Sequence, residues 1–231
     1  MRRIALLFAA LAIGAAPAAS QPAPGAPPGA PPAKPGEKAK ENANPCRDEV
    51  AAALQKLRKS SWFRMNTSMI TEQGPTTMQV DYVLPDRMHQ KVTVQATQQQ
   101  SEMILVGEDG WSKEGASDWK PLPNAIVQDL KAQVRQSVVE EQTDIGNYSC
   151  KGRTQFEGRD VLSYKLEDEV APDSTAPKNE TFRMFYVDVT TGLPVSNALL
   201  APGRETKPLF KAVYAFPLDM KIEPPANIAK P

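Results

Sequence analysis

The sequence predicts a mainly β domain of the α+β type: a single curved antiparallel sheet, forming a half-open barrel of about ten strands with two covering helices. The first observation is residues 78–111, where apolar and polar side chains alternate with the period of two that is typical of strands. The second is that similar runs continue as far as residue 217. The third is that residues 48–60 and 124–139 repeat apolar residues at helical spacing. Successive hairpins in such number curl, so helices across the concave side would complete the fold.

The N-terminal segment is expected to lie outside the folded domain. Residues 1–20 carry two arginines, an apolar core and then small residues, the pattern of a secretory signal peptide cleaved after Ser20 or Ala18. The core is shorter than the about 20 residues of a membrane span, so no transmembrane span is expected after cleavage. Residues 21–45 contain eight prolines and predict a disordered linker, either a spacer or an arm that reaches from a surface. The domain then occupies residues 46–231, in a bacterial periplasm or secreted.

The first helix is expected over residues 48–60, with Glu49 in its first turn and one apolar stripe. The stripe consists of Val50, Ala53, Leu54 and Leu57. Residues 61–71 follow directly as a strand. Its apolar face consists of Phe63, Met65 and Met69. A turn at residues 73–75 leads into the meander.

The meander begins with two strands that each have one apolar face. The face of the first consists of Met78, Val80, Tyr82 and Leu84. Pro85-Asp86 suits the turn between them. The face of the second consists of Met88, Val92, Val94 and Ala96. His89 falls on the opposite, polar face, and the polar residues 97–101 are expected to form a loop.

The next hairpin combines an apolar strand with a turn signal. Residues 103–106 are apolar without interruption, which predicts a strand covered on both faces. Asp109-Gly110 indicates a type I′ turn, because both central residues of that turn need a positive φ. Short strands at residues 111–113 and 119–121 should follow.

The second helix is expected from Asn124, as N-cap, to Val139. Its apolar stripe consists of Ile126, Val127, Leu130, Val134 and Val138. The remaining strands are predicted at residues 143–156, 161–166, 182–189, 193–200 and 209–217. Phe210, Tyr214 and Phe216 share a face of the last strand. The acidic residues 168–179 are expected to form a loop, and residues 221–231 to end the fold.

The two cysteines of the chain, Cys46 and Cys150, are expected to form a disulfide bond. In an oxidising compartment an even pair is normally bonded. The bond would close a loop of about a hundred residues and stabilise the fold by up to roughly 4–5 kcal/mol through the entropy of the unfolded chain. Redox and metal-binding roles are the weaker alternatives, since the chain has no C-x-x-C spacing.

No pattern of catalysis, cofactor binding or metal binding is found in the sequence. A Ser-His-Asp triad would depend on the single histidine, His89, and no G-x-S-x-G segment is present. There is also no H-E-x-x-H, P-loop or G-x-G-x-x-G motif. Removal of Arg2 and Arg3 leaves 25 basic against 27 acidic residues, so nucleic-acid binding is not expected. We expect no enzyme, no cofactor and no metal site, with His89 solvated.

Three segments resemble the LolA-like superfamily of periplasmic lipoprotein carriers and their lipid-binding relatives of the LppX/LprG type, a fold shared with some sensor domains. The segments are YVLPDRMHQKV (82–92), EMILVGEDGWSKEGASDWKPLP (102–123) and FYVDVTTGLPVSNAL (185–199). The resemblance covers roughly residues 48–225, and its motifs mark turns. It implies a concave apolar cavity between sheet and helices that holds acyl chains.

The candidate ligand-binding residues are the apolar side chains that the concave face and the second helix would present. They are Phe63, Met65, Met69, Met78, Val80, Tyr82, Val92, Val94, Ile126, Leu130 and Val134. Flexible, polarisable methionines suit a surface that repacks around variable apolar guests, although they can equally fill an irregular core.

Two functions follow. The first is a periplasmic binding protein for a lipid, a lipoprotein acyl chain or a similar apolar ligand. The alternative is a non-catalytic envelope interaction or sensor domain with a filled core and a protein partner.

Overall fold

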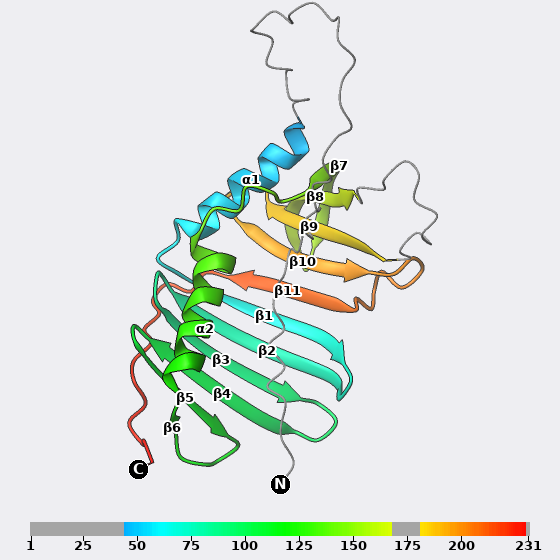
Figure 1. Cartoon of the computed structure of the whole chain (residues 1–231). Helices are drawn as coiled ribbons and strands as arrows, with labels where there is room; N and C mark the ends of the chain where they lie inside the picture. Colours follow the sequence, from blue (N-terminus) through cyan, green and yellow to red (C-terminus); the bar gives the residue numbers. More distant parts are fainter. Residues whose placement is uncertain (1–43, 168–180, 230–231) are drawn as a thin grey trace, which may run out of the picture.

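A computed structural model describes residues 44–167 and 181–229, and in this part of the chain eleven antiparallel strands form one sheet (Figure 1). The strands are β1 (Trp62–Thr71), β2 (Gly74–Val83), β3 (Arg87–Val94), β4 (Gln99–Val106), β5 (Asp109–Glu114), β6 (Lys120–Pro121), β7 (Asn147–Phe156), β8 (Arg159–Glu167), β9 (Phe182–Asp188), β10 (Pro194–Leu200) and β11 (Phe210–Ala215). The helices are α1 (Pro45–Arg58) and α2 (Asn124–Val134), and α2 continues as one π-helical turn, η1 (Arg135–Val139). The predicted fold class is confirmed, and the sheet is open rather than a closed barrel.

The strand order is β6-β5-β4-β3-β2-β1-β11-β10-β9-β8-β7, so the first and last strands are neighbours in the middle of the sheet. Strands β1 to β6 form one meander and β7 to β11 a second. The β1–β11 pairing, which runs from Arg64 opposite Ala215 to Met69 opposite Phe210, joins the two.

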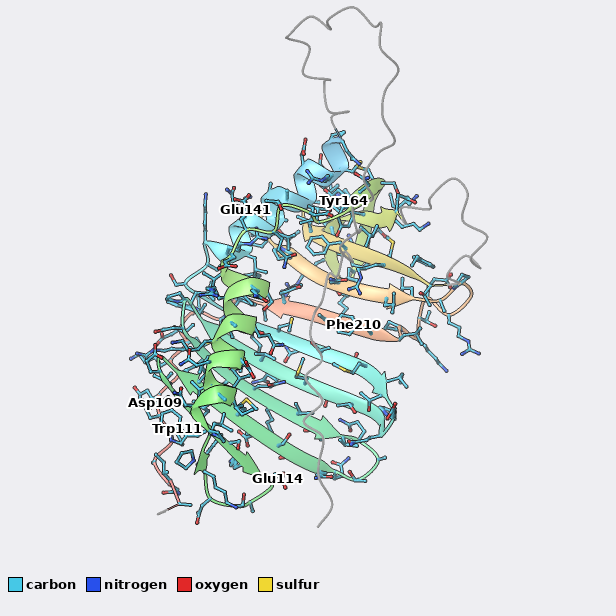
Figure 2. All side chains as sticks on the ribbon, in the orientation of Figure 1. Asp109, Trp111, Glu114, Glu141, Tyr164 and Phe210 are labelled. Atoms are coloured by element: carbon cyan, nitrogen blue, oxygen red, sulfur yellow. A yellow bond between two sulfur atoms is a disulfide. The ribbon has the colours of Figure 1, made fainter. Side chains whose placement is uncertain are left out.

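Both helices cover the concave face, each over a different half (Figure 1). Helix α1 lies over the second meander, where Val50 and Ala53 pack with Tyr164, Phe185 and other buried residues. Figure 2 shows Tyr164 beneath this helix. Helix α2 lies over the first meander, where its buried residues Val127, Leu130 and Val134 join the largest core cluster. The concave face therefore carries two neighbouring apolar cores, one under each helix.

The outer face of the first meander is covered by the C-terminal segment. Ile222 packs against Ile104 and Trp111, and the backbone of Trp119 bridges to Ile228. Met103 and Leu105 point to the opposite, concave face. The prediction that residues 103–106 form a strand covered on both faces is confirmed.

The hairpin between β4 and β5 corrects the expected turn. The two connecting residues are Gly107 and Glu108, and only Gly107 has a positive φ, of 59°. Gly110 instead lies within β5, where an added Cβ would come within 3.0 Å of Val127 Cγ2. The register that places Trp111 opposite Ile104 turns Gly110 toward α2, so its missing side chain permits close helix packing. The type I′ pattern of two positive φ values occurs at Glu157-Gly158.

The helix ends also differ from the prediction. Asn44 is the N-cap of α1, its side chain accepting a hydrogen bond from the backbone N–H of Arg47 at 3.1 Å, so the helix begins at Pro45 rather than at Asp48. Asn124 is the first residue of α2 and provides no side-chain cap. Residues 97–101 are only partly a loop, because β4 begins at Gln99.

Some predictions fall outside the described residues. These are the signal peptide (1–20), most of the linker (21–45) and the loop at 168–179. Of the helices in residues 44–167 and 181–229, none is long and apolar enough to cross a membrane.

Candidate functional site

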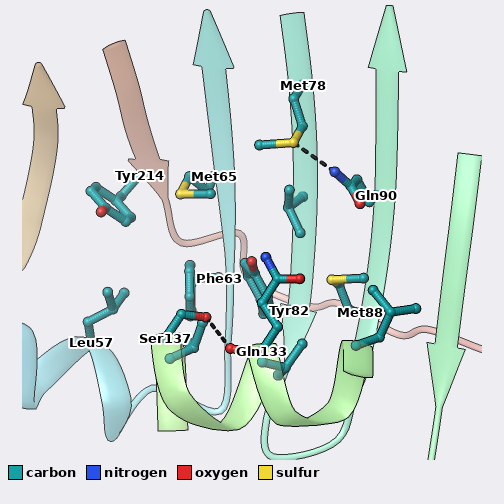
Figure 3. Close-up of a pocket in the computed structure, with 14 residues that line it drawn as sticks. Leu57, Phe63, Met65, Met78, Tyr82, Met88, Gln90, Gln133, Ser137 and Tyr214 are labelled. Atoms are coloured by element: carbon teal, nitrogen blue, oxygen red, sulfur yellow. Dashed lines mark hydrogen bonds between the residues drawn. The ribbon is translucent and has the colours of Figure 1, made fainter. Parts of the chain in front are cut away.

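A pocket lies on the concave face, between the first meander, β11 and the end of α2 (Figure 3). The floor comes from β1, β2, β3 and β11, the roof from α2 and η1, and one wall from the end of α1. Its lining consists of Leu57, Phe63, Met65, Met78, Val80, Tyr82, Met88, Gln90, Leu130, Gln133, Val134, Ser137, Val138 and Tyr214.

The floor follows from strand alternation and register. Phe63 lies opposite Tyr82 and Met65 opposite Val80, so alternate residues of β1 and β2 form one continuous apolar surface. The rings of Phe63 and Tyr82 stack with centroids 4.9 Å apart. These rings make a rigid base at one end, while the methionines give the other end flexible side chains.

The roof is a helix whose winding changes above the pocket. Leu130, Val134 and Val138 are spaced by four residues and point down from one face. The π-helical turn η1 also brings Ser137 to the lining, and its hydroxyl donates to the backbone oxygen of Gln133 at 2.5 Å (Figure 3). Turns of this kind occur frequently at functional sites and mark places where a helix can adjust.

The lining contains no charged side chain. Burial raises the pKa of Tyr82, and it raises the pKa of Tyr214 to about 12. Both hydroxyls therefore stay neutral at ordinary pH. The only lining amides are those of Gln90, which donates to Met78 Sδ at 2.8 Å, and of Gln133. The chemistry of the pocket suits an apolar guest, because most of its lining is apolar and none of it is charged.

The free volume of the pocket is about 80 Å³. Pockets that hold drug-sized ligands usually measure roughly 300–1,000 Å³. A guest as long as an acyl chain would therefore need Met65, Met78 and Met88 to change rotamer, or α2 to move away from the sheet.

Seven of the eleven predicted ligand-binding residues line this pocket: Phe63, Met65, Met78, Val80, Tyr82, Leu130 and Val134. Met69, Val92 and Ile126 are partly buried against the same core but lie outside the lining, and Val94 is buried farther along β3. These four lie outside because α2 crosses one end of the strands, and the predicted surface extended along their whole length. A role in binding remains a prediction for all eleven.

The remaining lining residues were not among the predicted site residues. Met88 and Tyr214 were visible as members of apolar strand faces. A place in the lining could not be predicted for Gln90, Gln133 and Ser137. Whether a polar side chain faces the pocket depends on how the helix packs on the sheet, and the local sequence does not show this.

The comparisons with known proteins support the architecture. No protein-family model matches the chain, and no curated protein matches it in sequence. The crystal structure of the Mycobacterium tuberculosis lipoprotein LppX superposes with a TM-score of 0.54 at 12% identity, over 78% of this chain and 100% of that one. This chain has the LppX fold. LprF from Mycobacterium bovis gives a TM-score of 0.49 at 10% identity, over 80% of this chain and 99% of that one. The sequence resemblance to the LppX type is therefore confirmed at the level of the fold.

Proposed function

We propose that this protein binds the acyl chain of a lipid or of an acylated protein in the pocket between the sheet and α2. The observation that carries the proposal is the lining, which has eleven apolar or aromatic side chains, three neutral polar ones and no charge, under a roof that ends in a π-helical turn. The likeness to LppX concerns the fold alone, so the proposal rests on the pocket lining.

The proposed setting is the bacterial periplasm or the exterior. The predicted signal peptide at residues 1–20 and the Cys46–Cys150 disulfide both suit an oxidising compartment. Residues 21–45 would then act as a linker ahead of the domain. We propose binding rather than catalysis, because the lining offers no nucleophile beside a base.

A second candidate function is an interaction or sensor domain whose core needs no ligand. The observation that favours it is the free volume of about 80 Å³, which is small for a bound lipid. The two candidates differ in whether the protein is stabilised by amphiphiles.

The test is a thermal unfolding series with fatty acids and detergent monomers of several chain lengths. A ligand at one hundred times its Kd stabilises the folded state by about 2.7 kcal/mol. For a domain of this size that corresponds to a rise in Tm of roughly 5–10 °C. Native mass spectrometry of protein purified from its own envelope would identify a bound species.

The matched variants are Val80→Phe and Val213→Phe. Val80 is 2% exposed on the pocket floor, and Val213 lies on the opposite face of the same sheet. Val80→Phe should abolish the ligand-dependent rise, because the larger ring occupies the free space, whereas Val213→Phe should keep it. Circular dichroism must first show that both fold, since overpacking costs about 1–3 kcal/mol. If the wild-type protein shows no shift at any chain length, the interaction-domain function is correct instead.

A further inference from the structure

A single cation lies on the otherwise uncharged inner surface of six neighbouring strands. Tyr214 of the pocket shares the inward face of β11 with Phe210. Phe210 pairs with Leu199 of β10, and Leu199 pairs with Arg183 of β9. Residues opposite each other in a ladder share a face, so Arg183 points to the concave side. Among the inward positions of the described strands from β9 across to β3, it is the only charged residue.

The surroundings of Arg183 are apolar and aromatic rather than acidic. Its guanidinium carbon lies 5.9 Å from the ring centre of Phe210. Figure 2 shows Phe210 on the part of the sheet that α2 does not cross. No carboxylate of the described residues lies within 4.0 Å of the guanidinium, whereas the outward cations Arg64 and Lys211 both have acidic partners. Arg183 therefore carries a charge for which the described fold provides no counter-ion.

One neutral polar residue contacts this cation, and two more lie near enough to feel its charge. Asn197, which is only 6% exposed, accepts a hydrogen bond from Arg183 at 3.2 Å and has its amide N–H groups unused within the described residues. Tyr148 and Tyr214 have hydroxyls without a hydrogen-bond partner in the same part of the chain. Burial raises the pKa of both, while the nearby charge of Arg183 acts in the opposite direction on each. All three groups can donate a hydrogen bond while neutral.

Tyr214 connects this polar cluster to the pocket. Its ring lines the pocket, and Figure 3 shows its hydroxyl on the side away from Met65. Phe210 and Tyr214 are four residues apart on one strand, about 13 Å at the usual rise. That distance is within the length of a fatty acyl chain, so one molecule can reach both places.

We propose that Arg183, Asn197 and Tyr148 form a headgroup subsite that binds the anionic end, carboxylate or phosphate, of an acyl ligand whose tail passes Tyr214 into the pocket. A guanidinium presents several N–H donors in one plane, which matches two oxygens of such a group. The apolar surroundings strengthen this interaction relative to one in water. The inference rests on the proposed function and narrows the ligand to anionic amphiphiles.

The experiment compares decanoate with decanol, which share an alkyl chain and differ in the charge of the head, by calorimetric titration below their aggregation concentrations. The wild-type protein should bind decanoate more tightly. Arg183→Gln should weaken decanoate binding about ten- to a hundredfold, the range of a charge-assisted hydrogen bond, and leave decanol binding unchanged. Arg183→Lys should recover part of the loss. Lys211→Gln, on the opposite face of the sheet, should change neither.

The outcomes separate this inference from the proposed function. If both probes bind equally to the wild-type protein and to Arg183→Gln, the headgroup subsite is wrong and the apolar pocket stands. An equal loss of both probes in Arg183→Gln would assign Arg183 a purely structural role and also overturn the subsite. If neither probe binds the wild-type protein, the proposed function itself fails. Acetate and inorganic phosphate, added alone, should not bind, since the tail provides most of the affinity.

Discussion

At the scale of single residues, Glu102 is the centre of a cluster of ion pairs on the outer face of the first meander. Its side chain is 14% exposed and lies 3.1 Å from Lys113 Nζ and 2.9 Å from His89 Nε2. Lys113 also lies 4.9 Å from the ring centre of Trp119. His89 lies on the outer face as expected and stays 33% exposed, and the ladder of β3 and β4 also brings Glu102 beside it. Burial alone would raise the pKa of Glu102, but its hydrogen bonds to Lys113 and His89 outweigh burial and lower it.

The first prediction concerns acid stability. A carboxylate whose folded-state pKa is lowered stabilises the protein above its ordinary pKa of 4.5, and this stability is lost as the pH falls through the folded-state value. Glu102→Gln should therefore reduce the free energy of unfolding at pH 7 and flatten its decline below about pH 4.5. Urea unfolding at pH 7, 5, 4 and 3 measures this. Parallel pH profiles for the two proteins would contradict it.

The residues of the pocket floor could be predicted from the sequence, but those of the headgroup subsite could not. Met65, Met78 and Val80 follow from alternation within one strand, which is a local property. Arg183 depends on the register between β9, β10 and β11, and Tyr148 on that between β7 and β8. A single sequence contains no local signal for pairing across such connections, so an inward arginine cannot be told from an outward one.

At the scale of elements, α1 is held to the second meander by more than its apolar stripe. Cys46 and Cys150 form the predicted disulfide, with Cα atoms 5.4 Å apart. The side chain of Asn44 donates to the backbone oxygen of Tyr148 at 3.1 Å. Helix α1 is therefore anchored at its first turn to the edge strand β7.

The second prediction is the effect of removing this anchor. The bond joins residues separated by 104 positions, so its loss should lower the free energy of unfolding by about 2–5 kcal/mol. Denaturant unfolding of Cys46→Ser/Cys150→Ser against the oxidised wild type measures the loss. Free thiols in the unreduced, denatured wild-type protein would show that the bond is absent in solution.

The types of the elements were predictable, and their ends were less so. Both helices and most strands follow from periodicity. The predicted turn at Asp109-Gly110 is wrong because the pairing of Val106 with Asp109 sets the turn at Gly107-Glu108, and Gly110 serves helix packing instead. The first turn of α1 was missed because Pro45 and Cys46 interrupt the helical pattern, although Pro is favoured at that position.

At the scale of the whole molecule, the two meanders depend on β11. This strand pairs with β1 on one side and β10 on the other, and Ala212, in its centre, is fully buried. The sheet was predictable as a set of strands. Its order was not, because the β1–β11 contact joins residues about 150 positions apart in the chain.

The third prediction tests this dependence. Val213→Pro removes a backbone N–H from a strand paired on both sides. Val213→Pro should lower the free energy of unfolding by about 1–3 kcal/mol more than Val213→Ala does, because a partner carbonyl is left without its donor. The free energies of unfolding of the two variants give the comparison. Equal losses would mean that this ladder does not hold the two meanders together.

The place of β11 also fixes the order in which the molecule can be completed during synthesis. A chain leaves the ribosome from its N-terminus, so β1 to β10 are available before the strand that belongs between β1 and β10. Until residues 210–215 emerge, β1 and β10 each expose an unpaired edge, the kind of template on which nascent chains associate. A chain that lacks its last tenth, ending before residue 210, would thus present two half-sheets that can pair with other chains instead of with each other.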